Sequence, residues 1–402
     1  MKTNSKPNIR FKGYTDDWEQ RKLGEIAERV QGNDGRMDLP TLTISAANGW
    51  MDQKERFSGN IAGKEQKNYT LLHKGELSYN HGNSKLAKYG AVFSLETYEE
   101  ALVPRVYHSF KVINGSSKFI EYYFATKIPD RELAKLVSSG ARMDGLLNIN
   151  FNEFMGINLT VPNKSEQEKI SNYFSNLDHL ITLHQRKCDQ TKELKKFMLQ
   201  KMFPKKGEKN PEIRFPGFTD DWEQRKLGDL LKEFSIKSTI ENEYKVLSST
   251  NSGMEFREGR VSGTSNLGYK IIKNGDLVLS PQNLWLGNIN INNLGKGLVS
   301  PSYKTFELIN IDSSFINPQL RTQKMLEEYK NSSTQGASVV RRNLEIDSFY
   351  QIKIFVPTIS EQEKIGSFFK QLDNTIALHQ RKCEQLKELK KFMLQNMFPK
   401  KG

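Results

Sequence analysis

The sequence has few of the features that mark secreted or membrane proteins. Only two cysteines, Cys188 and Cys383, occur in 402 residues, which excludes a disulfide framework. No apolar run approaches the roughly 18 residues of a membrane span. The N-terminal stretch MKTNSKPNIRFKGY has no apolar core of a secretory signal. These absences predict a cytoplasmic protein with no membrane partner.

Signatures of catalysis are also missing. The sequence has no G-x-x-x-x-G-K-[ST] phosphate loop, no G-x-G-x-x-G after a strand, no H-E-x-x-H and no G-x-S-x-G. The Asn/Asp-Pro-Pro-aromatic stretch of amino-methyltransferases is absent too. We therefore expect no catalytic residue, no metal and no cofactor bound by this chain. An enzyme that modifies or cleaves DNA by itself, with its own recognition domains, would need one of these catalytic motifs. Their absence argues against that alternative function.

Positive charge, in contrast, is in excess. Sixty Lys and Arg residues against 47 Asp and Glu give a net charge of +13. A basic surface attracts polyanions, of which DNA and RNA are the leading candidates. Many basic proteins bind no nucleic acid, so charge alone leaves both interpretations open.

The chain contains an internal duplication. IRFKGYTDDWEQRKLGEI (9–26) returns as IRFPGFTDDWEQRKLGDL (213–230), with 14 of 18 positions identical. SEQEKI…FPKKG (165–207) returns at 360–402, with 32 of 43 positions identical. The segments between them diverge but keep a common skeleton, as in KGELSYN (74–80) and NGDLVLS (274–280). The similar parts must therefore do one job twice, while the divergent parts share a fold and differ in what they contact.

The near-identical segments predict two long helices. Ser165 and Ser360 each begin an S-E-Q-E capping box, and Pro204 and Pro399 end each helix. Apolar or semi-polar residues recur about every 3.5 positions, as in a coiled-coil seam. The seam of the first copy is predicted to hold Ile170, Phe174, Leu177, Ile181, His184, Cys188, Thr191, Leu194 and Met198. We expect the two copies to pair antiparallel.

His184 with Cys188, and His379 with Cys383, lie four residues apart near the helix midpoints. If these side chains converged, two His and two Cys could bind zinc. The favoured interpretation is that they are core positions of the helix pair.

The divergent segments predict mixed α/β domains. Short β-type runs such as KVLSS and FYQIKIFVP are bounded by Asn-Gly and Gly turns, with helical stretches at 117–128 and 318–331. The fold class is therefore α+β, with two pseudo-twofold-related α/β recognition domains separated by a long antiparallel two-helix coiled coil.

The loops of these domains carry the candidate DNA-binding residues. Arg reads guanine, Asn and Gln read adenine, and Lys holds phosphates. The candidates in the first domain are Ser45, Asn48, Asn80, His81, Asn83, Lys85, Lys88, Tyr89, Arg105, Tyr107 and Arg142. Those in the second are Ser249, Asn251, Gln282, Asn283, Trp285, Tyr303, Lys304, Arg341 and Arg342. Any one of them alone could be a solvated loop residue, and Tyr107 and Tyr303 could be core residues.

Together, DDWEQRKLG, the GELSYN/GDLVLS strand and VPNKSEQEKI/VPTISEQEKI resemble the specificity subunit of a Type I restriction-modification system, over essentially the whole chain. The resemblance implies an N-terminal arm (1–24), a target recognition domain (25–160), a helical region (161–212), a second start motif and recognition domain (213–356), and a C-terminal helical region (357–402).

The resemblance also implies the function and partners. Each domain would read one half of an asymmetric bipartite site in double-stranded DNA, and the helices would set the spacer. Two modification subunits would bind S-adenosylmethionine and methylate adenine N6. Two restriction subunits would use ATP and Mg²⁺. The chain itself would bind none of these cofactors.

Ten side chains are expected at subunit interfaces. Trp18 and Trp222 are the large apolar residues of the repeated TDDWEQRKLG, and we expect them to anchor packing or docking sites beside the helix ends. The helix positions in this set are Ile170, Phe174, Leu177, Ile181, Ile365, Phe369, Leu372 and Ile376.

Overall fold

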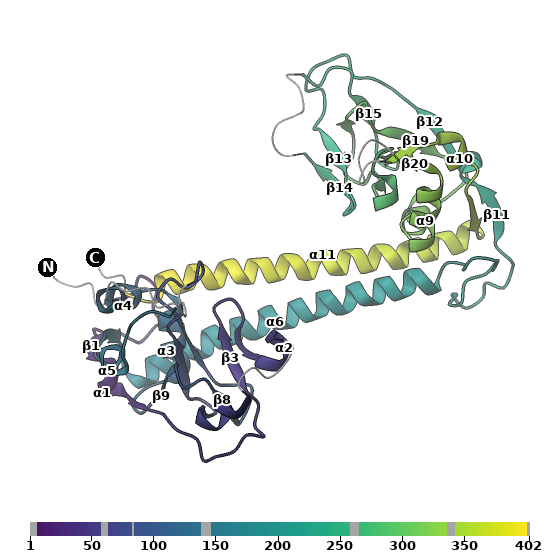
Figure 1. Ribbon diagram of the computed structural model, residues 1–402. Coiled ribbons are helices and arrows are strands. Elements are labelled where there is room, and N and C mark those ends of the chain that lie inside the picture. The colour runs from purple at the N-terminus through teal and green to yellow at the C-terminus, as the bar shows by residue number, and fades with distance from the viewer. Residues whose placement is uncertain are drawn as a thin grey trace. The chain divides into compact units, whose positions relative to one another are not determined.

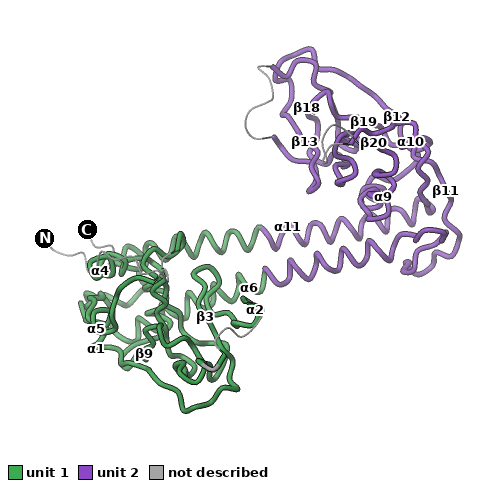
Figure 2. The backbone as a smooth tube through the Cα atoms, in the orientation of Figure 1, with its two compact units in different colours: residues 1–184, 381–402 green, residues 185–380 purple. Residues whose placement is uncertain are grey.

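A computed structural model describes residues 6–57, 63–82, 84–137, 146–257, 265–335 and 342–399. The chain forms two compact units, distinguished by colour in Figure 2. Unit 1 comprises residues 1–184 and 381–402, and unit 2 comprises residues 185–380. Each unit therefore takes its sheets from one repeat and its long-helix segments from both.

Unit 1 is built on antiparallel strands. Its four-stranded sheet has the order β2 (Ala27–Arg29), β9 (His108–Val112), β6 (Leu77–Asn80) and β7 (Ala91–Ser94). Three two-stranded ladders are β3 (Leu42–Ser45) with β4 (Gly49–Asp52), β5 (Thr70–His73) with β8 (Glu100–Val103), and β1 (Glu19–Lys22) with β10 (Asn158–Val161). The short helices are α1 (Leu23–Ile26), α2 (Gln53–Phe57), η1 (Gly63–Asn68), α3 (Ser117–Ala125), α4 (Asp130–Leu136) and α5 (Phe151–Met155).

Unit 2 repeats this topology. Its sheet has the order β12 (Leu231–Phe234), β19 (Lys304–Leu308), β16 (Leu277–Leu279) and β17 (Ile289–Ile291). The ladders are β13 (Leu247–Ser249) with β14 (Met254–Phe256), β15 (Lys270–Ile272) with β18 (Gly297–Val299), β11 (Glu223–Lys226) with β22 (Lys353–Val356), and β20 (Ser333–Gln335) with β21 (Arg342–Leu344). The short helices are α7 (Leu227–Leu230), η2 (Leu284–Leu286), α8 (Ser313–Gln319), α9 (Gln323–Asn331) and α10 (Ile346–Tyr350). The predicted α+β class is confirmed.

One predicted helix is divided. The stretch 318–331 holds the end of α8 and all of α9, because Thr322 leaves the helical conformation and caps α9. Its side chain accepts from the Met325 amide at 3.4 Å. A threonine at this position competes with the continuing helix by offering its own acceptor.

The two long helices are α6 (Lys164–Lys201) and α11 (Ile359–Asn396) (Figure 1). They pair antiparallel in each unit through contacts that recur at the repeat offset. In unit 1, Lys390 Nζ lies 2.5 Å from Asp178 Oδ1, and in unit 2, Lys195 Nζ lies 2.5 Å from Asp373 Oδ1. The predicted antiparallel pairing is confirmed.

The two cysteines face the opposite helix. In unit 2, Cys188 Sγ lies 4.0 Å from the Ile376 carbonyl oxygen, and in unit 1, Cys383 Sγ lies 3.9 Å from the Ile181 carbonyl oxygen. Both thiols are buried. Among the described residues, no three His, Cys, Asp or Glu side chains gather as metal ligands. These are core positions of the helix pair.

The predicted seam of the first helix is wrong at Leu194, and the equivalent residue of the second helix, Leu389, is exposed as well. Leu194 is 42% exposed and Leu389 is 40% exposed, so neither lies between the helices. The facing position is instead the next residue, since Lys195 and Lys390 make the interhelical ion pairs. A straight α-helix has 3.6 residues per turn, whereas the predicted seam repeats every 3.5 residues. The face that contacts the other helix therefore shifts by one residue along this part of the helix.

The predicted capping boxes are also wrong. Helix α6 begins at Lys164, and the Glu166 amide donates to Asn163 Oδ1 at 3.0 Å, so Asn163 is the capping residue. Glu166 is fully buried and accepts two bonds of 2.7 Å from the Arg10 guanidinium. In unit 2, Arg214 and Glu361 make the same bidentate pair at 2.6 and 2.8 Å. These hydrogen bonds raise the pKa of both arginines.

The glutamine of each S-E-Q-E motif ties the long helix to a short one. Gln167 Nε2 donates to the Pro162 carbonyl at 2.9 Å, and its Oε1 accepts from the Ser116 amide at 3.1 Å, just before α3. Gln362 makes the equivalent bonds to Pro357 and Asp312, both at 2.8 Å. The identity of the two motifs thus reflects a buried junction rather than helix capping.

The two tryptophans lie inside the cores. Trp18 is 3% exposed and packs edge-on against Phe119 and Phe398, with ring centroids 5.7 and 6.0 Å away. Trp222 packs in the same way in unit 2. The strand that follows each tryptophan pairs with the strand before a long helix. Of the packing and docking roles expected for these indoles, the structure shows packing.

The helix residues expected at subunit interfaces are likewise packed within the chain. Five of them are buried: Ile170, Phe174, Leu177, Ile365 and Phe369. The other three, Ile181, Leu372 and Ile376, are half-buried. Their burial leaves little surface for another subunit, so a docking face must be sought elsewhere on α6 and α11.

We expect Trp18→Ala to destabilise unit 1 by about 3–5 kcal/mol, because a large buried ring is lost and the cavity cannot fully collapse. Chemical denaturation followed by circular dichroism measures this. Trp18→Phe is the matched control and should cost less than half as much. An alanine variant of unchanged stability that fails to bind a partner subunit would instead favour the docking role.

Candidate nucleic-acid interface

In unit 1, three loops are drawn together by buried polar side chains. The Tyr107 hydroxyl, between β8 and β9, lies 3.0 Å from Thr43 Oγ1 and 3.3 Å from the Ile44 amide on β3. Asn80, at the end of β6, donates to the Ile44 carbonyl at 3.2 Å. The β3–β4 turn, the β6–β7 loop and the β8–β9 loop therefore lie together.

His81 adds a fourth segment. Its ring nitrogens lie 2.7 Å from the Leu147 carbonyl oxygen and 2.8 Å from the Val106 carbonyl oxygen, and the Leu147 amide donates back to the His81 carbonyl at 2.8 Å. His81 is buried and joins these loops, so its predicted role in touching DNA is replaced by a framework role.

His108 lies beside this junction. Its ring stacks on His81 with centroids 4.8 Å apart, and its Nε2 lies 2.8 Å from the Ile149 carbonyl. The pKa of His108 is lowered to about 4, mainly by burial and to a smaller extent by the charges of His81 and Arg29, while the Ile149 hydrogen bond acts in the opposite sense. The neutral ring is therefore the form that the fold favours.

Unit 1 should lose stability as the pH falls from about 6.5 to 4. In that range the unfolded chain binds a proton at His108 that the folded chain does not, so the loss is on the order of 3 kcal/mol, with about 2 kcal/mol of it between pH 7 and pH 5. Denaturant unfolding at pH 7 and pH 5 measures it. His108→Phe should remove most of this pH dependence, and an unchanged dependence in that variant would contradict the assignment.

The exposed side chains on these loops are polar or basic. Exposed candidates are Asn48, Lys85, Lys88 and Arg105, and half-buried ones are Ser45, Asn80 and Tyr89. Tyr107 is buried and belongs to the framework. Asn83 and Arg142 lie outside the described residues. What remains is a set of hydrogen-bonding and cationic groups suited to base edges and phosphates.

Unit 2 gathers the equivalent loops with different residues. The Tyr303 hydroxyl donates to the Ser249 carbonyl at 3.3 Å. Asn290 on β17 donates to Ser249 Oγ at 2.8 Å and to the Thr250 carbonyl at 2.7 Å. The Arg342 amide donates to the Gln282 carbonyl at 3.4 Å, which parallels the bond from Leu147 to His81.

Several candidates in unit 2 are likewise held by the framework. Ser249 is buried, and the Arg342 guanidinium donates to Ser333 Oγ at 2.8 Å. Lys304 pairs with Glu233 at 2.7 Å. Tyr303, Asn283 and Trp285 are half-buried, while Asn251 and Gln282 are exposed. Arg341 lies outside the described residues.

Two framework residues were not predicted. Asn290 lies between Ile289 and Ile291 in a short apolar strand, where an asparagine on the buried face is the available signal. Leu147 acts through its backbone groups, which no side-chain pattern reveals.

Both repeats of the chain match the model of one protein family. The sequence model described as "Type I restriction modification DNA specificity domain" matches residues 15–193 and again residues 219–388. The chain belongs to this Type I DNA specificity family. It is a DNA-recognition subunit of a family whose members are not themselves catalytic.

Similar proteins carry the same description. Two proteins of Methanocaldococcus jannaschii are described as specificity subunits of the Type I restriction enzymes MjaX and MjaVIII. The first is 22% identical over 94% of this chain and 91% of its own length, and the second 24% identical over 63% and 64%. The crystal structure of a Type I restriction-modification S subunit from M. genitalium has a TM-score of 0.61 at 14% identity, covering 99% of this chain and 100% of that one. The likeness to that structure is one of fold.

A membrane-spanning helix is not found. Among the described residues of this specificity-family chain, no helix is both long and apolar enough to cross a bilayer.

Proposed function

We propose that each recognition domain of this chain reads one half of an asymmetric bipartite site in double-stranded DNA. The domains span residues 25–160 and, with the repeated start motif, 213–356. The arm at 1–24 and the helical regions at 161–212 and 357–402 complete the chain. The two domains differ in their exposed loop residues, so the two half-sites should differ in sequence.

One observation carries this proposal. In both units a tyrosine hydroxyl ties the loop before the last sheet strand to the first hairpin: Tyr107 bonds Thr43 and the Ile44 amide, and Tyr303 donates to the Ser249 carbonyl. The exposed residues around these bonds differ. A constant framework with variable exposed polar groups supports sequence reading, since base edges are distinguished by the placement of donors and acceptors.

The paired helices set the spacer and bind the other subunits. The support is an exposed apolar pair that recurs at the repeat offset, Leu194 and Phe197 in unit 2 and Leu389 and Phe392 in unit 1. The two phenylalanines are 47% and 52% exposed. Apolar side chains three residues apart on an exposed helix face are typical anchors for a partner helix.

The complex supplies the chemistry. Two modification subunits bind S-adenosylmethionine and methylate adenine N6, and two restriction subunits use ATP and Mg²⁺ for cleavage. Such a modification subunit would flip an adenine out of the duplex to methylate it. It would reach only those adenines that lie where this chain holds the DNA. The duplicated helix faces support two copies of the modification subunit per chain.

DNA binding by the loops is tested by changing Lys85, Lys88 and Arg105 together to alanine. We expect the affinity for DNA that contains the recognised site to fall about tenfold or more. The slope of log K against log salt concentration should become shallower by about 3, because three phosphate contacts are lost. Fluorescence anisotropy over a salt series measures both. A control variant with Lys12, Lys22 and Lys111 changed to alanine removes the same charge from exposed positions outside the loops. Equal losses in the two variants would contradict loop-directed binding.

A further inference from the structure

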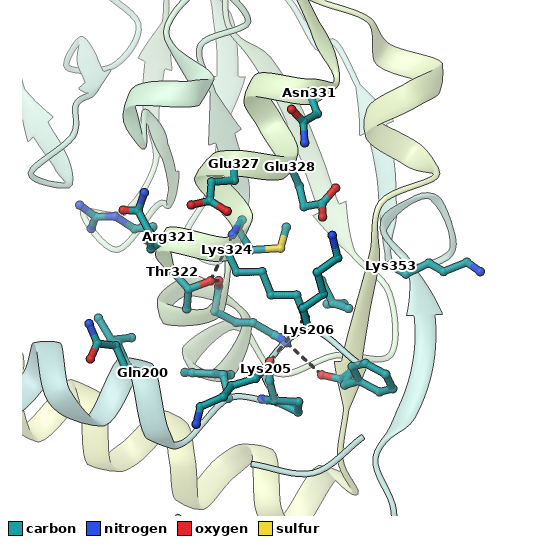
Figure 3. A pocket seen from close by; sticks show the side chains of 18 of the residues that line it. Gln200, Lys205, Lys206, Arg321, Thr322, Lys324, Glu327, Glu328, Asn331 and Lys353 are labelled. Atoms are coloured by element: carbon teal, nitrogen blue, oxygen red, sulfur yellow. Dashed lines mark hydrogen bonds between the residues drawn. The ribbon is translucent and has the colours of Figure 1, made fainter. Parts of the chain in front are cut away.

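A basic cavity in unit 2 is not used by the proposed function. It holds about 690 Å³ and lies where the end of α6 meets α9 and β22 (Figure 3). Its apolar wall includes Leu199, Phe203, Met325, Ile354 and Phe355. Its cationic side chains are Lys196, Lys205, Lys206, Arg321, Lys324 and Lys353, against Glu327 and Glu328. A cavity of this size and mixed lining suits a small organic ligand.

Most of the positive charge in this cavity is not neutralised within the chain. Lys205 pairs with Glu212 at 2.9 Å. Among the described residues, no carboxylate pairs with Lys196, Lys206 or Lys353. Figure 3 shows Lys205 and Lys206, from the segment after α6, near Lys324 of α9. Arg321 and Lys353 are directed away from Lys206 and Lys324 in Figure 3, so the grouped cations are Lys206 and Lys324, with Lys205 beside them. Such a group favours an anionic ligand.

Lys324 lies among charges of both signs. Burial lowers its pKa, the charge of Glu328 raises it, and the charge of Lys206, a smaller effect, lowers it. Its Nζ donates only a long bond of 3.4 Å, to the Pro204 carbonyl. An anion between Lys206 and Lys324 would relieve their repulsion, and the first turn of α9 would add its backbone dipole.

The cavity also offers a polar atom without a partner. Gln319 is buried in its wall, and its Nε2 donates to the Phe355 carbonyl at 3.0 Å. Its Oε1 has no hydrogen-bond partner in the described chain. A hydroxyl or amino group of a ligand would satisfy this acceptor, so the ligand should carry donors as well as negative charge.

We propose that this cavity binds a free nucleotide polyphosphate, with its phosphates between Lys206 and Lys324 and its nucleoside against the apolar wall. Phosphate is also the anion of a DNA backbone, but a half-enclosed cavity of this volume admits a small ligand more readily than a duplex. None of the recognition-loop candidates lines the cavity, although its Arg321 donates to the Asn251 carbonyl of one such loop. A ligand here would give this subunit a nucleotide-dependent property of its own.

The test is isothermal titration of ATP, and separately of inorganic tripolyphosphate, into the full-length chain. We expect saturable ATP binding at one site, weakened at least tenfold by Lys206→Glu and by Lys324→Ala. Tripolyphosphate should bind more weakly than ATP. Lys206 is exposed, so its substitution should leave the fold intact, and Lys324→Arg should restore binding. Lys232→Glu, an exposed lysine of the same unit, is the matched control.

The outcomes separate this site from the proposed DNA function. If ATP does not bind, or binds equally to all variants, the nucleotide site does not exist. If Lys206→Glu weakens duplex DNA binding while ATP has no effect, the cluster holds the DNA backbone and the proposal fails. Sequence preference for DNA should be unchanged in Lys206→Glu, so failure here leaves the recognition role intact.

Discussion

Replacing residues 229–355 with the corresponding segment of another family member should change one half of the recognised DNA sequence and leave the other half as it was. The reason is that unit 2 builds its loop framework only from residues within this segment, as in the bonds of Ser249, Asn290 and Tyr303. The difference in binding free energy between the old and the new half-site sequence should change by several kcal/mol, since each mismatched base pair costs about 1–3 kcal/mol. Mapping adenine methylation in cells that carry the exchanged chain measures this.

The matched control is the reciprocal exchange of residues 25–160, which should change the other half-site alone. Each exchanged segment begins shortly after β1 or β11 and ends within β10 or β22, the strands of the ladders that join each domain to its long helix. If either exchange altered both half-sites, the assignment of one domain to one half-site would be wrong.

Phe392→Glu and Phe197→Glu should each abolish binding of one modification subunit, and the double variant should bind none. Each change places a charge at the centre of an exposed apolar face, where the loss of an aromatic anchor costs about 2–4 kcal/mol or more. Sedimentation velocity of the chain mixed with its modification subunit gives the number of copies bound.

The stability of the chain should be almost unaffected by these changes, because both rings are about half exposed. Phe392→Leu keeps an apolar group and should retain the partner. If both glutamate variants assembled normally, the modification subunits would have to bind through another face of the helices.

The duplication made the helices and the fold class predictable from the sequence. Two near-identical copies reveal which positions are constrained, and helical periodicity is a local property. The structural role of the repeated S-E-Q-E residues was harder to predict. S-E-Q-E has the form of a capping box, yet Glu166 and Gln167 are buried partners of Arg10 and Ser116. Arg10 also recurs as Arg214, so the pairing could have been inferred from the repeat itself.

The candidate site was less predictable than the fold. Residue type alone does not separate Lys85, which is exposed, from His81, which is buried against two carbonyls. That difference depends on long-range packing among four segments. The exposed Phe197 was missed because an apolar residue in an amphipathic helix is expected to face the core.

The most direct test is the sequence of the methylated site. The chain should be expressed with its modification subunit in a host that lacks restriction activity, and N6-methyladenine should be mapped across the genome. The expected result is one motif of two unlike half-sites separated by a non-specific spacer of constant length. Methylation at a single continuous motif, or at a symmetric pair of identical half-sites, would contradict the account.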